Sequence, residues 1–336
     1  MTDLAPPPYA DLGPDLILDA LNSVGLPADG RLLALNSFEN RVYQAGVDDA
    51  QPVIAKFYRP NRWSDEAIQE EHAFTLELAQ REIPVVPPLT LHGATLHRYG
   101  GFRFAVYPRR GGRMPEFERR ETLEWMGRFI GRIHAVGAVT AFRHRPTLDI
   151  ASFGTEPRDF LLHGGWLPPA LLPVWKGVVD EALEGVRRCF DRAGAYTSIR
   201  LHGDCHAGNV LWVEWGTEQG PHFVDFDDSR MGPAVQDLWM LLSGEREQQI
   251  AQFADVLTGY EDFMEFDPRQ AHLIEALRTL RLIHYSAWIA RRWDDPAFPA
   301  GFPWFGTARY WQDRILELRE QVALMSESPL RPVGSG

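Results

Sequence analysis

Short runs of alternating apolar and polar residues fill the first third of the chain, and a period of two is typical of strands. The predicted strands cover residues 31–36, 41–45, 52–58, 89–92 and 102–107. Two segments of the same region, 15–24 and 63–81, repeat their apolar positions at helical spacing instead. The first third therefore predicts a small, mostly antiparallel sheet with one helix before it and one inserted helix.

Helical spacing dominates the rest of the chain. In 121–136 (ETLEWMGRFIGRIHAV), apolar side chains such as Leu123 and Ile130 fall on one face, as in a helix packed against a core. Further helices are predicted over 168–193, 234–242, 247–263, 269–292 and 304–325. Two apolar runs, 210–213 and 222–226, interrupt this region and are separated by a polar turn that contains Gly, which predicts a hairpin.

The chain of 336 residues is longer than one typical domain, and the change of pattern divides it in two. We predict an α+β fold of two lobes, with a β-rich N-terminal lobe over 1–107 and an α-helical C-terminal lobe over 114–328. The segment between them, 108–113 (PRRGGR), differs in composition from both and predicts a hinge. Residues 329–336 are expected to form a flexible tail.

The densest group of chemically useful side chains lies in 200–228, RLHGDCHAGNVLWVEWGTEQGPHFVDFDD. Asp204 and Asn209 stand five residues apart at the mouth of the predicted hairpin, and Asp225 projects from its returning strand. An Asp can accept the proton of an acceptor hydroxyl, while Asn and Asp oxygens can hold Mg²⁺ on nucleotide phosphates. Kinase catalytic loops separate a base Asp from a metal-binding Asn by the same spacing. The combination favours phosphoryl transfer over a surface loop made of turn-forming residues.

Lys56 is a further candidate, because it stands in the strand-like run Val53–Phe57 and a buried ammonium needs anionic partners. The chain contains two lysines against 32 arginines, so a lysine retained in an apolar run invites a specific reason. Nucleotide phosphates and a helix carboxylate would supply the partners, while an edge-strand lysine is the ordinary alternative. Glu66, Glu70 and Glu71 on the following helix compete for the role of that carboxylate.

Several neighbouring residues are assigned supporting roles. Asp237 is expected to accept hydrogen bonds from the loop that carries Asp204, and Asp227 is assigned a structural or outer role. His202 is interpreted as a packed histidine that orients the loop, since no companion cluster of Cys and His indicates zinc. The turn that begins at Ser37 contains no Gly, so phosphates there would depend on backbone N–H groups and the Ser37 hydroxyl. An ordinary hairpin turn is the alternative.

Charge and composition narrow the partners. The net charge of −12 and the pI near 5.4 argue against a general nucleic-acid binder, which would carry a basic face. The same acidity suits a cationic acceptor, so it does not identify a substrate. Cys189 and Cys205 are too few for a disulfide framework, which predicts a reducing cytoplasm. The sequence contains no long apolar span, and its N-terminus shows no leader in which basic residues are followed by apolar ones. Neither membrane insertion nor secretion is therefore expected.

The motifs HGDCHAGNVLW, VDFDD and QDLW together resemble the aminoglycoside-phosphotransferase branch of the protein-kinase-like fold. More closely, four stretches resemble the bacterial stress response kinase A family of Ser/Thr protein kinases. These stretches are LNSFENRVYQ, VIAKFYRPNRWS, HGDCHAGNVLW and VDFDDSRMGPAVQDLWMLLSG. The resemblance runs from about residue 10 to about residue 325. The sequence lacks the APE segment and a recognisable activation loop of protein kinases. Regulation through activation-loop phosphorylation is therefore not expected.

The resemblance implies a role for each matching position. Asp204 would accept the proton, Asn209 would bind Mg²⁺, and Asp225 would be a second metal-binding carboxylate that the family also counts as catalytic. Ser37 would contact ATP. Lys56 would hold the α- and β-phosphates and pair with a helix carboxylate, for which the spacing to Ile83-Pro84 selects Glu71, with Glu70 as the alternative.

The predicted function is an ATP- and Mg²⁺-dependent kinase that phosphorylates Ser or Thr of proteins, itself included, in a stress response. A small alcohol such as an aminoglycoside, choline or homoserine is the alternative acceptor, and the acidic stretch 260–267 (YEDFMEFD) could then line a cationic pocket. A non-catalytic nucleotide-binding scaffold is the third hypothesis, but a degenerate member would be expected to lack at least one of the motif residues. The oligomeric state stays open, and a monomer is compatible with the sequence.

Overall fold

The computed structural model describes residues 7–214 and 219–330, which divide into two compact units. Within the described residues, the first unit comprises 7–115, 142–145, 208–214 and 219–228, and the second comprises the remainder. The chain thus passes between the units several times, including once between Ala207 and Gly208. The hinge proposed at 108–113 stays a prediction.

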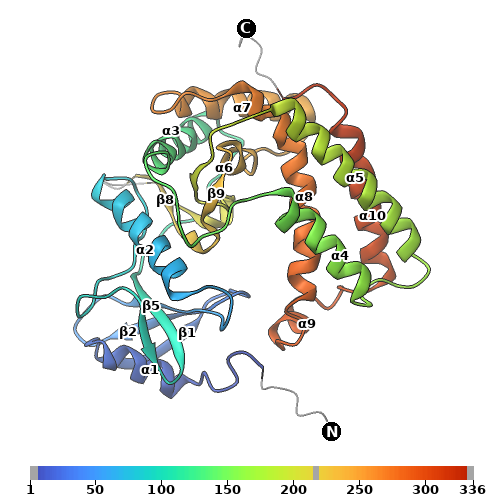
Figure 1. Ribbon diagram of the computed structural model, residues 1–336. Coiled ribbons are helices and arrows are strands. Elements are labelled where there is room, and N and C mark those ends of the chain that lie inside the picture. Colours follow the sequence, from blue (N-terminus) through green and yellow to red (C-terminus); the bar gives the residue numbers. More distant parts are fainter. Residues whose placement is uncertain (1–6, 215–218, 331–336) are drawn as a thin grey trace. The chain divides into compact units, whose positions relative to one another are not determined.

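The first unit contains an antiparallel five-stranded sheet with the strand order β1-β2-β3-β5-β4. Its strands β1, β2 and β5 are labelled in Figure 1. Its helices are α1 (Pro14–Ser23) and α2 (Asp65–Gln80). The sheet strands are β1 (Ala28–Ala34), β2 (Arg41–Val47), β3 (Val53–Phe57), β4 (His97–Tyr99) and β5 (Phe102–Pro108). The apolar face of α1 packs with the sheet, so Ile17 and Leu21 share a core with Phe57 and Phe104.

A hairpin of β7 (Val210–Val213) and β8 (Gly220–Phe223) completes this unit. It is tied to the rest of the unit through its backbone: the Phe223 carbonyl accepts from the Val86 N–H at 3.0 Å. The predicted hairpin is therefore confirmed, but its second strand ends at Phe223 and not at 226. Asp225 lies after the strand, where its φ of 61° falls in the left-handed region.

One predicted strand is wrong. Residues 89–92 form no strand; Leu91 makes a single bridge to Ala94 across a tight turn whose His92 and Gly93 both have positive φ. The strand β4 appears later, at His97–Tyr99, and pairs with β5. The apolar run of 89–92 was compatible with a strand in isolation, but the following Gly allows the chain to reverse before a ladder can form.

The second unit is mainly helical, and the α+β fold class is confirmed. Its helices are α3 (Arg120–Gly137), α4 (Glu156–His163), α5 (Leu172–Ala193), α6 (Val235–Trp239), α7 (Arg246–Tyr260), α8 (Ile274–Ala290), α9 (Ala297–Gly301) and α10 (Ala308–Leu324). The helices α5, α8 and α10 pack against one another (Figure 1). Two strands, β6 (Ile199–Leu201) and β9 (Arg230–Gly232), pair antiparallel. The sequence pattern missed α4, α9, β6 and β9, because three to eight residues hold too little periodicity.

Glycines allow α3 and α7 to approach closely. A Cβ at Gly127 would lie 1.9 Å from the carbonyl oxygen of Val256, and one at Gly131 would lie 2.6 Å from that of Tyr260. Any side chain at these positions would force the helices apart. The close approach matters for the site, because it brings the Tyr260 hydroxyl of α7 within 3.0 Å of His134 Nδ1 on α3.

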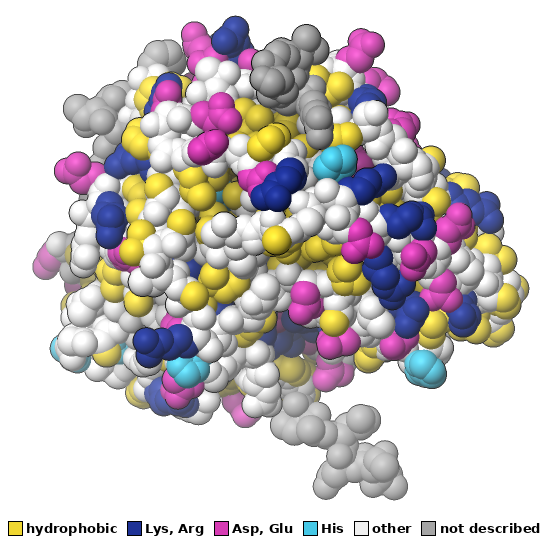
Figure 2. Space-filling model, turned by 45° about the horizontal axis from the view of Figure 1, so that its top comes forward, with side chains coloured by type: hydrophobic (Ala, Val, Ile, Leu, Met, Phe, Trp, Pro, Cys, Tyr) yellow, Lys and Arg dark blue, Asp and Glu magenta, His cyan; other side chains and the backbone are white. Residues whose placement is uncertain are grey.

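The surface carries mixed charge. On the face in Figure 2, Lys and Arg side chains lie among Asp and Glu side chains. Interspersed charges of this kind favour short-range ion pairs over a field of a single sign. Within residues 7–214 and 219–330, no helix combines the length and the hydrophobicity that a bilayer-spanning segment requires.

Candidate active site

Lys56 lies in β3 of the first unit with only 7% of its side chain exposed. Its Nζ donates to Oδ1 of Asp225 at 2.8 Å and lies 3.5 Å from Oδ1 of Asp227. Burial alone would lower the pKa of Lys56, but the charges of Asp225 and Asp227 outweigh it and hold the pKa well above its ordinary value. The lysine is therefore a charged ammonium with anionic partners, as expected, but these partners are Asp225 and Asp227 and not a carboxylate of the following helix.

The backbone of the hairpin places Asn209 beside the residue that precedes Asp225. The N–H of Val224 donates to the carbonyl of Asn209 at 3.0 Å, which sets Asn209 opposite the residue before Asp225. The side chain of Asp225 remains 54% exposed although it binds Lys56. Its carboxylate is thus held at one oxygen and still accessible to a ligand.

Asp227 is the buried member of this carboxylate group, with 5% of its side chain exposed. Arg62 donates to its Oδ2, and the same guanidinium donates to Asp228 at 2.8 Å. Burial raises the pKa of Asp227, but the charges of Arg62 and Lys56 more than offset it and lower the pKa below its ordinary value. The structural role predicted for Asp227 agrees with these contacts, whereas Arg62 was not predicted as its partner.

The oxygen donors around Lys56 fit a hard divalent cation such as Mg²⁺. Asp225 offers an exposed carboxylate, and Oδ1 of Asp227 is buried with no hydrogen-bond partner among the described residues. Mg²⁺ prefers oxygen and commonly takes one or two protein carboxylates, completing its six ligands with phosphates and waters. Across the described ranges, no group of three or more His, Cys, Asp or Glu is arranged to hold a metal by itself.

Glu71 has a different ion partner from the one expected. Its carboxylate accepts from Arg145 at 3.1 Å, and the side chains of both residues are buried. Among the described residues, the ion partners of Lys56 are Asp225 and Asp227, so the direct Lys56–Glu71 pair expected from the resemblance is not formed. Glu71 acts on Lys56 only as a nearby charge that raises the pKa of the lysine.

Glu70, the alternative partner, is excluded from that role. Its carboxylate accepts from the backbone N–H groups of Arg143, His144 and Arg145 at 2.7, 2.8 and 3.1 Å. Glu70 therefore fastens segment 142–145 to α2 within the first unit. Because segment 142–145 is anchored in this way, the Arg145 guanidinium lies beside Glu71. An arginine that is distant in sequence can therefore pair with Glu71.

Replacing Glu71 by Gln should change how stability depends on pH. Burial raises the pKa of Glu71 to about 7, against the opposing charges of Lys56 and Arg145. A carboxyl whose pKa is higher in the folded state contributes stability below its ordinary pKa of 4.5 and loses that contribution as pH rises to about 7. The neutral Gln has no such loss.

Urea unfolding of the wild type and Glu71→Gln across this pH window would test the expectation. The free energy of unfolding of the variant, relative to that of the wild type, should increase as pH rises from 4.5 to about 7. The difference between the two proteins removes contributions from other titrating groups. A difference that stays constant over the window would contradict a raised pKa for Glu71.

Ser37 lies in the turn between β1 and β2, and its hydroxyl donates to the Asn40 carbonyl at 2.6 Å. The carbonyls of the turn are engaged as well: Arg59 donates to Phe38 at 3.2 Å and to Glu39 at 3.0 Å. The turn is thus shaped by side chains in place of glycines. Its role in ATP binding stays a prediction.

Asp204 belongs to the second unit, where Arg281 and His206 contact its two carboxylate oxygens. Arg281 of α8 donates to Oδ1 at 2.5 Å, and Nε2 of His206 lies 3.3 Å from Oδ2. Burial raises the pKa of Asp204, but the hydrogen bond from His206 and the charge of Arg281 prevail and lower it below the ordinary value. Asp204 is therefore ionised, as a proton acceptor must be.

Asp237 holds the loop that carries Asp204. Its carboxylate, which is fully buried, accepts from the backbone N–H groups of His202 and Gly203, both at 2.8 Å. Nε2 of His134 on α3 donates to the same carboxylate at 3.0 Å, because a carboxylate can only accept, and Nδ1 of this histidine lies 3.0 Å from the Tyr260 hydroxyl. The predicted role of Asp237 is confirmed, and buried His202, whose Nδ1 accepts from the Asp204 N–H at 3.4 Å, is the packed histidine that was expected.

Replacing Asp237 by Ala should lower the free energy of unfolding by about 3–5 kcal/mol, because buried backbone donors lose their charged acceptor. Phosphoryl transfer should fall as well, since the loop of Asp204 loses its clamp. Urea unfolding and transfer from labelled ATP measure the two effects. Asp262→Ala is the control: this exposed carboxylate pairs with Arg128 and should cost about 1 kcal/mol or less. Equal stability of the two variants would refute the clamp.

Cys205 is buried next to Asp204, and burial raises the pKa of its thiol well above the ordinary value. A thiolate is therefore disfavoured there, and a small packing residue is the better interpretation than a reactive thiol.

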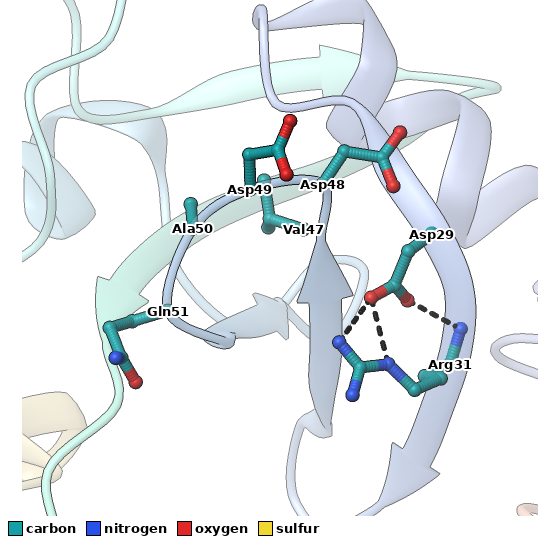
Figure 3. Close-up of a pocket in the computed structure, with 7 residues that line it drawn as sticks. All are labelled: Asp29, Arg31, Val47, Asp48, Asp49, Ala50 and Gln51. Carbon is teal, nitrogen blue, oxygen red and sulfur yellow. Dashed lines mark hydrogen bonds and ion pairs between the residues drawn. The ribbon is translucent and has the colours of Figure 1, made fainter.

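A surface pocket of about 670 Å³ lies elsewhere in the first unit, at β1 and the turn between β2 and β3. Figure 3 shows Asp48 and Asp49 on the turn and the ion pair between Asp29 and Arg31 on the strand. None of the candidate residues lines this pocket. Because the carboxylates of its turn are exposed, this pocket is interpreted as solvated surface and not as a binding site.

Three arginines of the site were not selected from the sequence. Arg62 binds Asp227, Arg145 binds Glu71 and Arg281 binds Asp204. A buried carboxylate requires a cation, which was a usable signal. The chain contains 32 arginines, and which of them pairs with a given carboxylate depends on the fold, so the sequence alone does not identify the partner.

Comparison with known proteins agrees with this fold. The model of the phosphotransferase enzyme family matches residues 31–274. Stress response kinase A of Escherichia coli (strain K12) is 43% identical over 323 residues, which cover 96% of each chain. Serine/threonine protein kinase RdoA of Salmonella typhimurium (strain LT2) is 42% identical over the same length, again 96% of each chain.

Solved structures share the fold at much lower identity. An amicoumacin kinase in complex with AMP-PNP, Ca²⁺ and Ami is 18% identical with a TM-score of 0.68, and 90% of each chain is covered. A microcompartment-associated aminopropanol kinase is 16% identical with a TM-score of 0.67, covering 92% of this chain and 95% of that one. The resemblance inferred from the motifs is confirmed: the chain belongs to the phosphotransferase enzyme family and, within it, to the stress response kinase A group.

Proposed function

We propose that this protein is an ATP- and Mg²⁺-dependent kinase that phosphorylates Ser or Thr of proteins, including itself. The observation that carries the proposal is the 43% identity, over nearly the whole of both chains, to a protein named stress response kinase A. The retained set of Lys56, Asp204, Asn209 and Asp225 supports catalysis over a scaffold role. Action in a cytoplasmic stress response belongs to the same proposal and rests on the names of these relatives and the two free cysteines.

The first unit would hold the nucleotide. Lys56 would bind the α- and β-phosphates, since its ammonium is buried, charged and paired with exposed Asp225. Asn209 and Asp225 would hold Mg²⁺, which neutralises phosphate charge when bound. Ser37 would contact ATP from the β1–β2 turn. Glu71 would contribute through its charge near Lys56 and through its buried pair with Arg145.

The second unit would supply the proton acceptor. As the acceptor oxygen forms its bond to the γ-phosphorus, the bond between that phosphorus and the β–γ bridging oxygen breaks, and ADP leaves with the electron pair. The hydroxyl proton passes to the carboxylate of Asp204. A carboxylate of low pKa is a weak base, so its main contribution would be to orient the hydroxyl and receive the proton late.

A small-molecule acceptor is the second candidate, because the solved structures with this fold include an aminopropanol kinase and an amicoumacin kinase. The acidic stretch 260–267 gives it little support. Tyr260 is buried, Asp262 pairs with Arg128, and Asp267 pairs with Arg269. Two of the four carboxylates of the stretch are thus already engaged by arginines of the same unit.

Incubation with ATP labelled at the γ-phosphate separates the candidates. Reactions would contain Mg²⁺ and either the protein alone, a generic basic protein, or a set of choline, homoserine and an aminoglycoside. Label on Ser or Thr of protein supports the proposal, and mapping identifies the sites. Label found only in a small alcohol would replace it by the second candidate. Nucleotide binding without any transfer would favour the scaffold.

A further inference from the structure

Asp204 presents no free oxygen to an acceptor in this structure. Arg281 donates to Oδ1 at 2.5 Å, and His206 lies 3.3 Å from Oδ2. A hydroxyl that gives its proton to Asp204 must approach one of these oxygens within hydrogen-bond distance. One of these two side chains must therefore share its oxygen or move before the acceptor can bind.

Arg281 is the better suited of the two to respond to a ligand. Its side chain is 43% exposed, so the guanidinium can turn toward a ligand without itself becoming a buried, unpaired charge, and His206 remains as a partner of Asp204. Its five N–H donors can bind a carboxylate or a phosphate in bidentate fashion. His206 is exposed to a similar degree, at 41%, but has a single ring edge to offer and is joined to Asp204 by the loop itself.

The helix that carries Arg281 continues with aromatic side chains at helical spacing. Tyr285 follows after four residues and stacks on Trp288, with ring centroids 5.7 Å apart and planes at 16°. Arg292 lies over the Trp288 ring at 5.3 Å. All four residues are partly exposed. Arg281, Tyr285 and Trp288 lie on α8 and Arg292 lies two residues beyond its end, so together they form a cationic and aromatic strip that begins beside Asp204.

We propose that Arg281 recognises an acidic group beside the acceptor hydroxyl, a carboxylate or phosphate on a neighbouring residue of the protein substrate. That group draws the guanidinium away from Oδ1 of Asp204, and the freed oxygen then receives the hydroxyl. One contact thus both selects the acceptor and exposes the proton acceptor. Acceptors with a cation at the same position are disfavoured, because they meet Arg281 with like charge.

The inference rests on the proposed function, and one experiment separates their failures. The probes are otherwise identical peptides that contain one Ser and carry Glu, Gln or Lys at each neighbouring position in turn. The kcat/KM of transfer from labelled ATP is measured for the wild type, Arg281→Gln, Arg281→Lys and the control Arg278→Gln. Arg278 lies one turn earlier on α8 and pairs with Glu275.

The wild type should prefer Glu over Lys by about tenfold or more at one of these positions. In Arg281→Gln the ratio should fall to near one, Arg281→Lys should recover part of it, and Arg278→Gln should keep it. The ratio cancels any general loss of folded enzyme.

Transfer without a Glu preference, or a preference that survives in Arg281→Gln, overturns the inference but leaves the proposed kinase activity standing. If a raised KM for ATP were the sole effect of Arg281→Gln, Arg281 would bind the nucleotide and not the acceptor, and the inference would also be overturned. If no peptide and no protein is labelled, the proposed function itself fails.

Discussion

Asp204→Asn is expected to lower the rate of phosphoryl transfer by about 10²–10⁴-fold, the usual contribution of a positioned proton acceptor. Asn has the same shape but cannot take the hydroxyl proton, and it removes the charge that Arg281 and His206 now bind. Nucleotide binding should persist, because the residues proposed to hold ATP belong to the first unit. The variant should therefore separate binding from chemistry.

Two measurements are needed, transfer from labelled ATP and titration with an unreactive ATP analogue. Asp262→Asn is the matched control, since this carboxylate of the second unit also pairs with an arginine, Arg128, but lies outside the proposed site. The control should retain both transfer and binding. Turnover of Asp204→Asn equal to that of the wild type would remove Asp204 from its proposed role.

The order of strands and helices was largely readable because it depends on local periodicity. Runs such as 53–57 and 121–136 contain enough residues for a period to emerge, and β3 and α3 formed there. Elements of three to eight residues, such as β6 and α4, were missed for want of length. The false strand at 89–92 has the right composition, but Gly93 turns the chain back on itself.

The candidate site divides in the same way. Asp237 was correctly expected to accept hydrogen bonds from the loop of Asp204, since the backbone N–H groups of a tight loop are natural partners for a buried carboxylate, although 34 residues separate it from Gly203. The partner of Glu71 was not predictable, because it depends on the fold. Arg145 reaches it only because Glu70 anchors segment 142–145 to α2. Contacts between residues far apart in sequence leave no periodic trace.

Asp225→Asn should lower transfer by about 10²–10³-fold and raise the Mg²⁺ concentration needed for half-maximal rate. Asn is chosen over Ala because φ at this position is 61°, a conformation that Asn tolerates better than most residues. The amide keeps one oxygen for a cation but loses the charge that pairs with Lys56 at 2.8 Å. Excess Mg²⁺ should therefore restore part of the rate.

Asp228→Asn provides the control on the same turn, since Asp228 is exposed to 36% and its carboxylate pairs with Arg62 and not with Lys56. Its Mg²⁺ dependence should match that of the wild type. Initial rates over a range of Mg²⁺ at saturating ATP would compare the three proteins. If Asp225→Asn responded to Mg²⁺ as the wild type does, the exposed carboxylate beside Lys56 would not be a metal ligand, and the pair would have to be interpreted as structural.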